Sequence, residues 1–350
     1  MASCAPASAT VFCHRVAEHA ASGAIRDVLE HARLSYAPEA LSEGAVFGFS
    51  GALALSARIS GSALPAIDLD GRTPSLEREL LRHLGLAADW CTTDDPDEAW
   101  RLLRAELQAG RPTLVRADRA ELDYRAGGRH DTLHAIVVTG LDAEAGIVWV
   151  ADADFAQPQP CTLDALARAR RSPAWPEPAR HGMLRLRPGA RLAHPRAAVA
   201  AALRRTVQNM RRPRRSEHMH IRCGLEAVDA VADSWERLPA MAGERLAQTL
   251  AALRFGICEG GSGGALYRSL QARFLHDAAA LLGSEPLTRA ALACDDLADA
   301  WRALGGSLAC EDVAIAHESA RPWLGRIQAL ERRHVELVEQ HLSESRASVA

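Results

Sequence analysis

A predicted helix start near the N-terminus is the first place where chemistry could occur, in "RVAEHAASGAIRDVLEH" (residues 15–31). The small residues Ala20–Ala24 lead into Ile25, Val28 and Leu29, and this i, i+3, i+4 spacing predicts a helix with an apolar stripe on a core. Backbone N–H groups and the positive dipole end at such a start stabilise a thiolate or a developing oxyanion. A close-packed helix start without any chemistry explains the small residues equally well.

A histidine and an aspartate further along the chain form the second candidate. His134 opens the predicted strand "HAIVVTGLD" (134–142), and Asp152 lies on the next one, "GIVWVADAD" (146–154). A short acidic turn joins the two, so an antiparallel pair would bring imidazole and carboxylate within hydrogen-bond reach. Such a contact fixes the tautomer of the imidazole and makes it a base. A structural histidine is the alternative.

Helical and strand-like segments alternate through the first half of the chain and would position these residues. Segments 75–86 and 95–110 have helical periodicity, and the second has acidic residues in its first turn and Gly110 at its end. "PTLVRAD" (112–118) is a further β-rich run. Glycines interrupt segment 41–55, which predicts a turn-rich crossing instead of one long helix.

Prolines mark a boundary in the middle of the chain, because residues 172–195 carry five of the 17 prolines and one possible strand, "GMLRLRP". The segments predicted to be helical beyond it are 197–210, 224–238, 243–257, 265–283, 290–309 and 324–342. The sequence therefore predicts an α+β fold, with a first domain at 1–190 built on an antiparallel sheet and an all-α domain at 191–350.

Composition excludes several classes of protein. The chain has 350 residues, 48% of them hydrophobic and 24% charged, which is typical of a globular protein with room for two domains. A net charge of −3 predicts no general attraction to nucleic acid or to an anionic membrane. The one basic run, "RRPRR" (211–215), is a solvated loop or a phosphate-contacting patch.

The N-terminus has no charged leader followed by an apolar core, and no window approaches a membrane span, so we expect a cytoplasmic protein. Eight scattered cysteines form no C-x-x-C pair and no zinc spacing. We therefore expect reduced thiols and no metal site.

Several of these stretches resemble a known family. "EHAASGAIRDVL", "LSEGAVFGFSGAL", "ELDYRAGGRHDTLHAIVVTGLD", "VWVADAD" and "LDALARARRSP" resemble the N-terminal domain of the butirosin biosynthesis protein H family, from about residue 12 to about residue 175. "CEGGSGGALYRSLQARFLHDAA" (258–279) resembles the helical domain that often follows it.

The resemblance implies a papain-like acyltransferase of antibiotic biosynthesis. In such proteins a cysteine after the histidine at the helix start accepts an acyl group from a carrier-protein thioester, and a histidine and an aspartate assist its transfer to a small amine. These roles map to His134, to Asp152 and, for the nucleophile, to Ala20. A methyl group cannot form a thioester, so the cysteine was either replaced by alanine or lost. The intact flanking residues favour a recent or deliberate loss.

The implied donor is an acyl or peptidyl carrier protein with its phosphopantetheine arm, and no bound cofactor is implied. An amine within the acyl chain would instead give cyclisation. A hydrolase with the same apparatus and a non-catalytic binding protein are the rival functions. The sequence leaves open whether the protein forms a homo-oligomer. We also expect the helical half to complete the pocket, and the Ala20 Cβ to lie within a side-chain length of the His134 ring.

Further substrate contacts are expected near the helix start from His19, Ser22, Tyr124 and Glu43, although a helix cap is the alternative role for Glu43. Ser22 is a poor substitute nucleophile, because two positions turn it ~200° from Ala20. Cys13 precedes the helix and does not match a nucleophile position.

In the helical half, "EGGSGG" (259–264) includes Gly261, Ser262 and Gly263. Their N–H groups could cradle a phosphate such as that of phosphopantetheine. No lysine follows the last glycine, so this is not a P-loop. A glycine-rich turn is the alternative for the loop, and packing is the alternative for Arg268.

Overall fold

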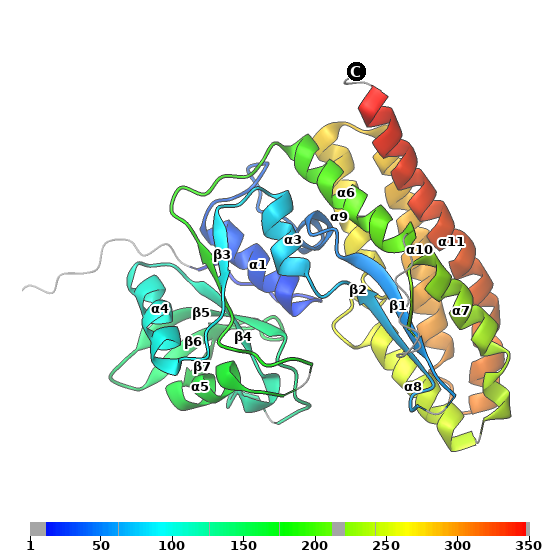
Figure 1. Ribbon diagram of the computed structural model, residues 1–350, viewed down its shortest axis with the longest axis horizontal. Helices are drawn as coiled ribbons and strands as arrows, with labels where there is room; N and C mark the ends of the chain where they lie inside the picture. The colour runs from blue at the N-terminus through cyan, green and yellow to red at the C-terminus, as the bar shows by residue number, and fades with distance from the viewer. Residues whose placement is uncertain are drawn as a thin grey trace, which may run out of the picture. The chain divides into compact units, whose positions relative to one another are not determined.

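The computed structural model describes residues 12–61, 63–125, 127–174, 176–211, 221–241 and 243–347 (Figure 1). Its contacts divide the chain into two compact units. The first unit consists of the described residues within Met1–Leu41 and Leu86–Leu192, and the second of those within Ser42–Gly85 and Ala193–Ala350. The fold is α+β, as the sequence predicts.

A six-stranded antiparallel sheet forms the centre of the first unit, with the strand order β3-β8-β4-β5-β6-β7. The strands are β3 (Ala88–Cys91), β4 (Thr113–Ala117), β5 (His134–Asp142), β6 (Ile147–Ala151), β7 (Gln159–Thr162) and β8 (Met183–Leu186). The β5 and β6 strands pair across a short turn, as their sequence spacing predicts.

Three helices pack on this sheet: α1 (Ala20–His31), α4 (Pro96–Gln108) and α5 (Leu163–Arg171). Residues of α4, α5 and five strands form one hydrophobic cluster, which includes Leu103, Ile136 and Leu166. The first five residues of β5 are all buried, so both faces of this strand are covered, and α1 packs along it. The Asp95 carboxylate caps α4, which explains the predicted start of this helix.

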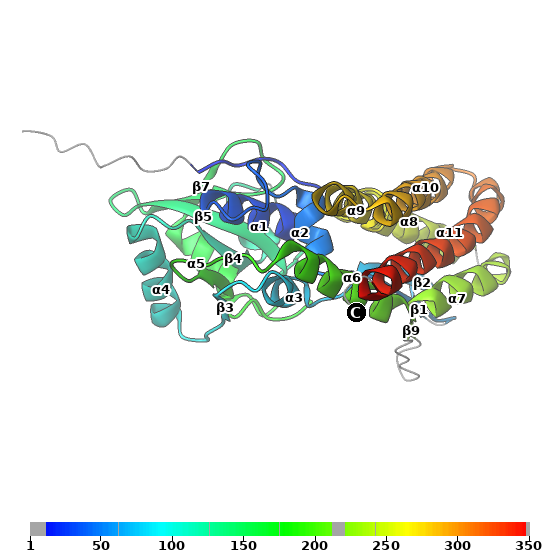
Figure 2. The same cartoon turned by 90° about the horizontal axis from the view of Figure 1, so that it is seen from above.

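Helices dominate the second unit (Figures 1 and 2). They are α2 (Glu43–Phe49), α3 (Leu76–His83), α6 (Pro195–Arg211), α7 (Leu225–Trp235), α8 (Gly243–Cys258), α9 (Arg268–Leu282), α10 (Glu285–Ser307) and α11 (Val313–Ala347). A three-stranded antiparallel sheet, in the order β2-β1-β9, accompanies them and consists of β1 (Leu53–Ile59), β2 (Ile67–Arg72) and β9 (Ile221–Cys223). Long helix α10 packs against both α9 and α11.

The main difference from the sequence-based expectation concerns residues 42–85. Local periodicity identified α3, but segment 41–55 contains the short helix α2 and the first half of β1. These elements belong to the same unit as residues 193–350, so the helical unit contains a sheet and is discontinuous in sequence. The β1 strand pairs with β9, and a residue pattern does not reveal such a distant partner.

No helix within the described parts of the chain is long and apolar enough to cross a membrane.

Candidate active site

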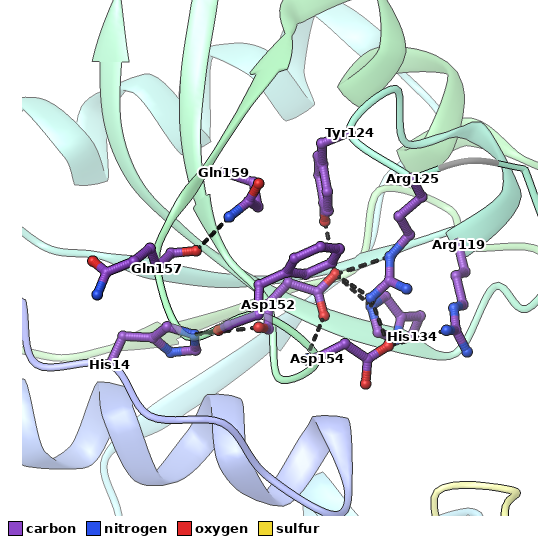
Figure 3. Close-up of polar contacts among 10 residues, drawn as sticks. His14, Arg119, Tyr124, Arg125, His134, Asp152, Asp154, Gln157 and Gln159 are labelled. Carbon is purple, nitrogen blue, oxygen red and sulfur yellow. Dashed lines mark hydrogen bonds and ion pairs between the residues drawn. The ribbon is translucent and has the colours of Figure 1, made fainter.

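His134 and Asp152 lie at adjacent strand ends in the first unit. His134 is the first residue of β5 and Asp152 directly follows β6, and the register of this antiparallel pair brings the two side chains together. The His134 Nε2 atom is 2.9 Å from Oδ2 of Asp152 (Figure 3). Both residues are buried, with 6% and 1% of their surface exposed. The hydrogen bond expected from the strand pairing is therefore present.

Asp152 is held by two further side chains from the loop before β5 (Figure 3). The Tyr124 hydroxyl donates to Oδ2 of Asp152 at 2.8 Å, and Arg125 donates to the same oxygen from Nη2 at 2.6 Å and from Nε at 3.1 Å. Burial opposes ionisation of Asp152, but His134 and then Arg125 outweigh it and hold the pKa of this carboxyl well below its usual range. Asp152 is thus a fixed negative charge beside the imidazole.

The contacts of Arg125 determine which nitrogen of His134 carries the proton. Nη2 of Arg125 has two hydrogens, and it lies 2.6 Å from Asp152, 2.9 Å from Oδ2 of Asp154 and 3.3 Å from His134 Nε2. Carboxylates are the stronger acceptors and are closer, so both hydrogens point to them. His134 Nε2 is therefore the donor to Asp152, which leaves the lone pair on Nδ1.

Nδ1 of His134 remains accessible for chemistry. No described residue forms a hydrogen bond with this atom, and the atom is not completely buried. The nitrogen that could accept a proton therefore keeps contact with solvent.

Asp154 and Phe155 surround Arg125 on its other sides. The guanidinium lies over the Phe155 ring, 5.2 Å from its centroid, and Asp154 also accepts from Arg119 at 3.0 Å. Burial disfavours charge on Arg125, but Asp152 and Asp154 more than compensate, and its pKa is raised. Sequence patterns singled out Tyr124 but missed its neighbour Arg125, since the direction of a loop side chain is not encoded in periodicity.

The start of α1 lies next to the segment that follows β6. The Ala17 N–H donates to the Ala153 carbonyl at 3.0 Å, and a Cβ added to Gly23 would lie 2.3 Å from the Ala17 Cβ, so this close approach requires glycine. Ala20 is partly exposed, whereas the next nine residues of α1 are all buried. The distance between Ala20 and the His134 ring stays a prediction.

His14 fastens this region from the extended segment before α1 (Figure 3). Its Nδ1 is 2.7 Å from Oδ2 of Asp27, and its Nε2 is 2.9 Å from the Phe155 carbonyl and 3.2 Å from the Asp152 carbonyl. Both ring nitrogens thus face acceptors. Burial opposes the charged ring, but these acceptors outweigh it and raise the pKa of His14.

Other predicted residues at the helix start have partners within it. His19 Nδ1 lies 2.8 Å from the Ser22 hydroxyl, and Ser22 is completely buried, so this hydroxyl does not reach solvent. Cys13 is exposed, but desolvation and then Glu30 raise the pKa of its thiol, which disfavours the reactive thiolate. Neither residue resembles a substitute nucleophile.

The remaining predicted residues belong to the second unit. Ser42 caps α2 through the Ala45 N–H, so Glu43 is a first-turn residue and not the cap. The Ser262 hydroxyl donates to the carbonyls of Gly256 and Ile257 at the end of α8. Gly261 and Gly263 both have positive φ, which favours the glycine-rich turn, and α9 begins only at residue 268.

Arg268 is fully buried and pairs with Glu331 at 2.8 Å, so packing accounts for its presence. Of the basic run 211–215, only Arg211 lies within the described residues, where it pairs with Glu339 at 2.8 Å. Among the residues that the structure describes, no group of three or more His, Cys, Asp and Glu side chains could hold a metal ion.

Two family models match the chain. The model described as Butirosin biosynthesis protein H, N-terminal, matches residues 19–153, and the model described as Domain of unknown function (DUF4872) matches residues 164–338. The second match alone spans half of the chain, and the first extends from the helix start to the residue after Asp152. No curated protein matches this sequence.

Proposed function

The chain belongs to the butirosin biosynthesis protein H family, with the two-domain architecture, and from this premise we propose that its framework is that of an acyltransferase. The family match implies a role in biosynthesis of the butirosin type. In the proposed reaction an acyl or aminoacyl group moves from the phosphopantetheine thioester of an acyl or peptidyl carrier protein to a small amine. An amine within the acyl chain would give cyclisation at the same site.

One observation carries the proposal: the hydrogen bond from His134 to Asp152, which leaves the Nδ1 lone pair of His134 unused and accessible. This is the arrangement of a general base that is oriented by a carboxylate. A second observation supports it, because the His19 side chain does not cap α1. The first N–H groups of this helix can therefore stabilise an oxyanion.

The proposed chemistry needs a cysteine at position 20. His134 would take the proton of the cysteine thiol, and the resulting thiolate would attack the thioester carbonyl. The carbon–sulfur bond to phosphopantetheine would then break, and the leaving thiolate would take that proton from His134. The amine would then attack the enzyme thioester, lose its proton to His134 and release the cysteine sulfur as the amide forms. Ala20 cannot perform either step, so we expect no covalent intermediate on the chain as it stands.

The Ala20→Cys variant tests this proposal. We expect a single acyl adduct at position 20 by intact-protein mass spectrometry after exposure to an acyl-pantetheine thioester. Because His134 would be the base, adding His134→Ala should slow adduct formation on the order of 10² to 10⁴-fold. Val16→Cys is the matched control, since it places an exposed thiol before the helix, away from its N–H groups.

The rival functions give different results in the same experiment. Rapid release of free acid from Ala20→Cys without any amine would indicate a hydrolase. If the thiol at position 20 reacts no faster than the one at position 16, and no adduct forms, the transferase proposal fails and a non-catalytic binding protein replaces it.

A further inference from the structure

A second buried carboxylate, that of Asp118, lies at the base of the loop between β4 and β5. Asp118 directly follows β4, and its side chain has no exposed surface. The two strands are paired neighbours, so the outgoing limb of the loop (residues 119–125) begins beside the end of the returning limb (127–133). The outgoing limb ends at Arg125, and the returning limb leads into His134. Neither the acyl-transfer proposal nor the family match assigns Asp118 a role.

Four donors surround the Asp118 carboxylate. Oδ1 accepts from the N–H groups of Ala120 at 3.1 Å and Asp131 at 3.2 Å. Oδ2 accepts from the Ser172 hydroxyl at 2.6 Å and lies 2.7 Å from Nδ1 of His130. An ionised carboxylate has about four acceptor positions, so this side chain has a donor for each of them.

Asp118 is held in its charged form. Burial opposes its ionisation, but Ser172 and then His130, followed by the backbone N–H groups, outweigh burial and lower the pKa of this carboxyl below its usual range. Hydrogen bonds to an ionised acceptor are stronger than those between neutral groups. The base of the loop is therefore held more firmly than a surface loop without a buried charge.

These contacts join the two limbs of the loop. Ala120 belongs to the outgoing limb, whereas His130 and Asp131 belong to the returning limb. The Arg119 N–H also donates to the Asp131 carbonyl at 3.0 Å. The outgoing limb carries the guanidinium, and the returning limb leads into the imidazole, that share the Asp152 carboxylate (Figure 3).

We propose that Asp118 is a positioning residue for His134. By joining the two limbs it sets where the Arg125 guanidinium stands relative to the imidazole, and thereby which ring nitrogen keeps the lone pair. This inference rests on the proposed function, in which His134 is the base. The loop also has a contact near its tip, where Asp123 accepts from the Thr162 N–H at 3.1 Å. If that contact alone held the loop, loss of Asp118 would leave His134 unchanged.

The ring nitrogens of His134 report on this role without any acyl transfer. In ¹⁵N NMR spectra of the full chain with labelled histidine, we expect a protonated Nε2 and an unprotonated Nδ1, assigned by the signal that His134→Gln removes. Asp118→Ala should give a mixture of tautomers, because the limbs are no longer joined by a carboxylate. Asp118→Asn should restore most of the original signal, since its amide oxygen can still accept from both backbone N–H groups.

Glu106→Ala is the matched control. Glu106 is another buried carboxylate of the first unit, 4% exposed, and it accepts from Arg111 at 2.6 Å and from Arg185 at 3.0 Å, outside the loop. Its loss should lower Tm, as Asp118→Ala does, but leave the His134 signals unchanged. If Asp118→Ala lowers Tm without altering these signals, or if both variants alter them equally, the proposal is overturned.

A milder variant covers the case in which Asp118→Ala does not fold. His130→Ala combined with Ser172→Ala removes two of the four donors and spares the carboxylate with its backbone contacts. It should change the His134 signals in the same direction to a smaller extent, and unchanged signals would again overturn the proposal.

Rates in the Ala20→Cys protein provide the second test. Asp118→Ala should slow acyl-adduct formation on the order of 10-fold and add little to the effect of Arg125→Gln, because both act on the same ring. Losses that multiply fully would show that Asp118 acts elsewhere. An Ala20→Cys protein that forms no adduct would count against the proposed function alone, since the NMR measurement does not depend on acyl transfer.

Discussion

Arg125 is the residue that does most to define the state of His134. It donates both Nη2 hydrogens to the carboxylates of Asp152 and Asp154. The His134 ring must therefore donate from its Nε2 to Asp152. An uncharged side chain at this position would leave Asp152 with fewer donors and the tautomer less restricted. In the proposed reaction Arg125 is therefore a positioning residue, which would act through His134.

We expect Arg125→Gln, made in the Ala20→Cys protein, to slow acyl-adduct formation on the order of 10-fold or more, because a wrong His tautomer removes base catalysis. Arg125→Lys should recover part of the rate through its charge. Arg119→Gln is the control, since Arg119 is half exposed and reaches only Asp154, and it should leave the rate within about 2-fold. Equal losses in the 125 and 119 variants would contradict this role.

Sequence reasoning found His134 and Asp152 because strand pairing across a short turn is a local property. It missed Arg125 and the contacts of His14, because both depend on where a loop or an extended segment returns to the sheet. It also assigned possible ligand roles to residues 261–263 and to Arg268. A glycine-rich loop that caps the preceding helix and one that binds phosphate have the same composition, and only the contacts distinguish them.

At the scale of elements, hydrogen bonds of the His14 ring as well as apolar packing hold α1 against the sheet. The His14 ring joins Asp27 on α1 to the carbonyls of Asp152 and Phe155 after β6. The segment before α1 thereby links the helix start to the loop that carries Asp152. Helix α1 was predictable from its apolar spacing, whereas this link was not, since it joins residues that are far apart in the sequence.

The His14 link should depend on pH. The pKa of His14 is raised above its ordinary value of 6.5, so its charged form stabilises the folded state below about pH 6.5. That contribution is lost as pH rises through the raised pKa of the folded state. We expect the difference in Tm between the unaltered chain and His14→Gln to be a few °C near pH 6 and to shrink by pH 8.

Differential scanning calorimetry of both proteins across this range provides the measurement, and the other histidines cancel in the difference. A difference that grows as pH rises would show that His14 is not held in its charged form.

At the scale of the whole molecule, the contacts and the sequence divide the chain differently. Strand periodicity and the proline-rich segment predict one domain boundary near residue 190. The chain does cross from the first unit to the second at residues 192–193. Residues 42–85 nevertheless belong to the helical unit, where α2 packs closely on α9. A Cβ at Gly48 would lie 1.8 Å from the Phe274 ring, so this contact requires glycine.

This division predicts how fragments behave. A chain ending at residue 192 would keep β1, β2 and α2 but lose β9 and α9, their partners in the second unit. Phe47, Leu55 and Ile67, each at most 1% exposed in the full chain, would then face water. We expect this fragment to bind a hydrophobic dye, to aggregate, and to unfold without a cooperative transition, because the apolar surface has no other place to pack.

A second fragment isolates the cause. Replacing residues 42–85 of the 1–192 chain with a flexible Gly/Ser linker removes the elements that have lost their packing partners. It retains the internal contacts of the first unit. This version should be monomeric in size-exclusion chromatography and unfold cooperatively, with the sheet and α1 intact. If the plain 1–192 chain folds cooperatively and the linker version does not, residues 42–85 are part of the first unit's fold, and the division derived from the contacts is wrong.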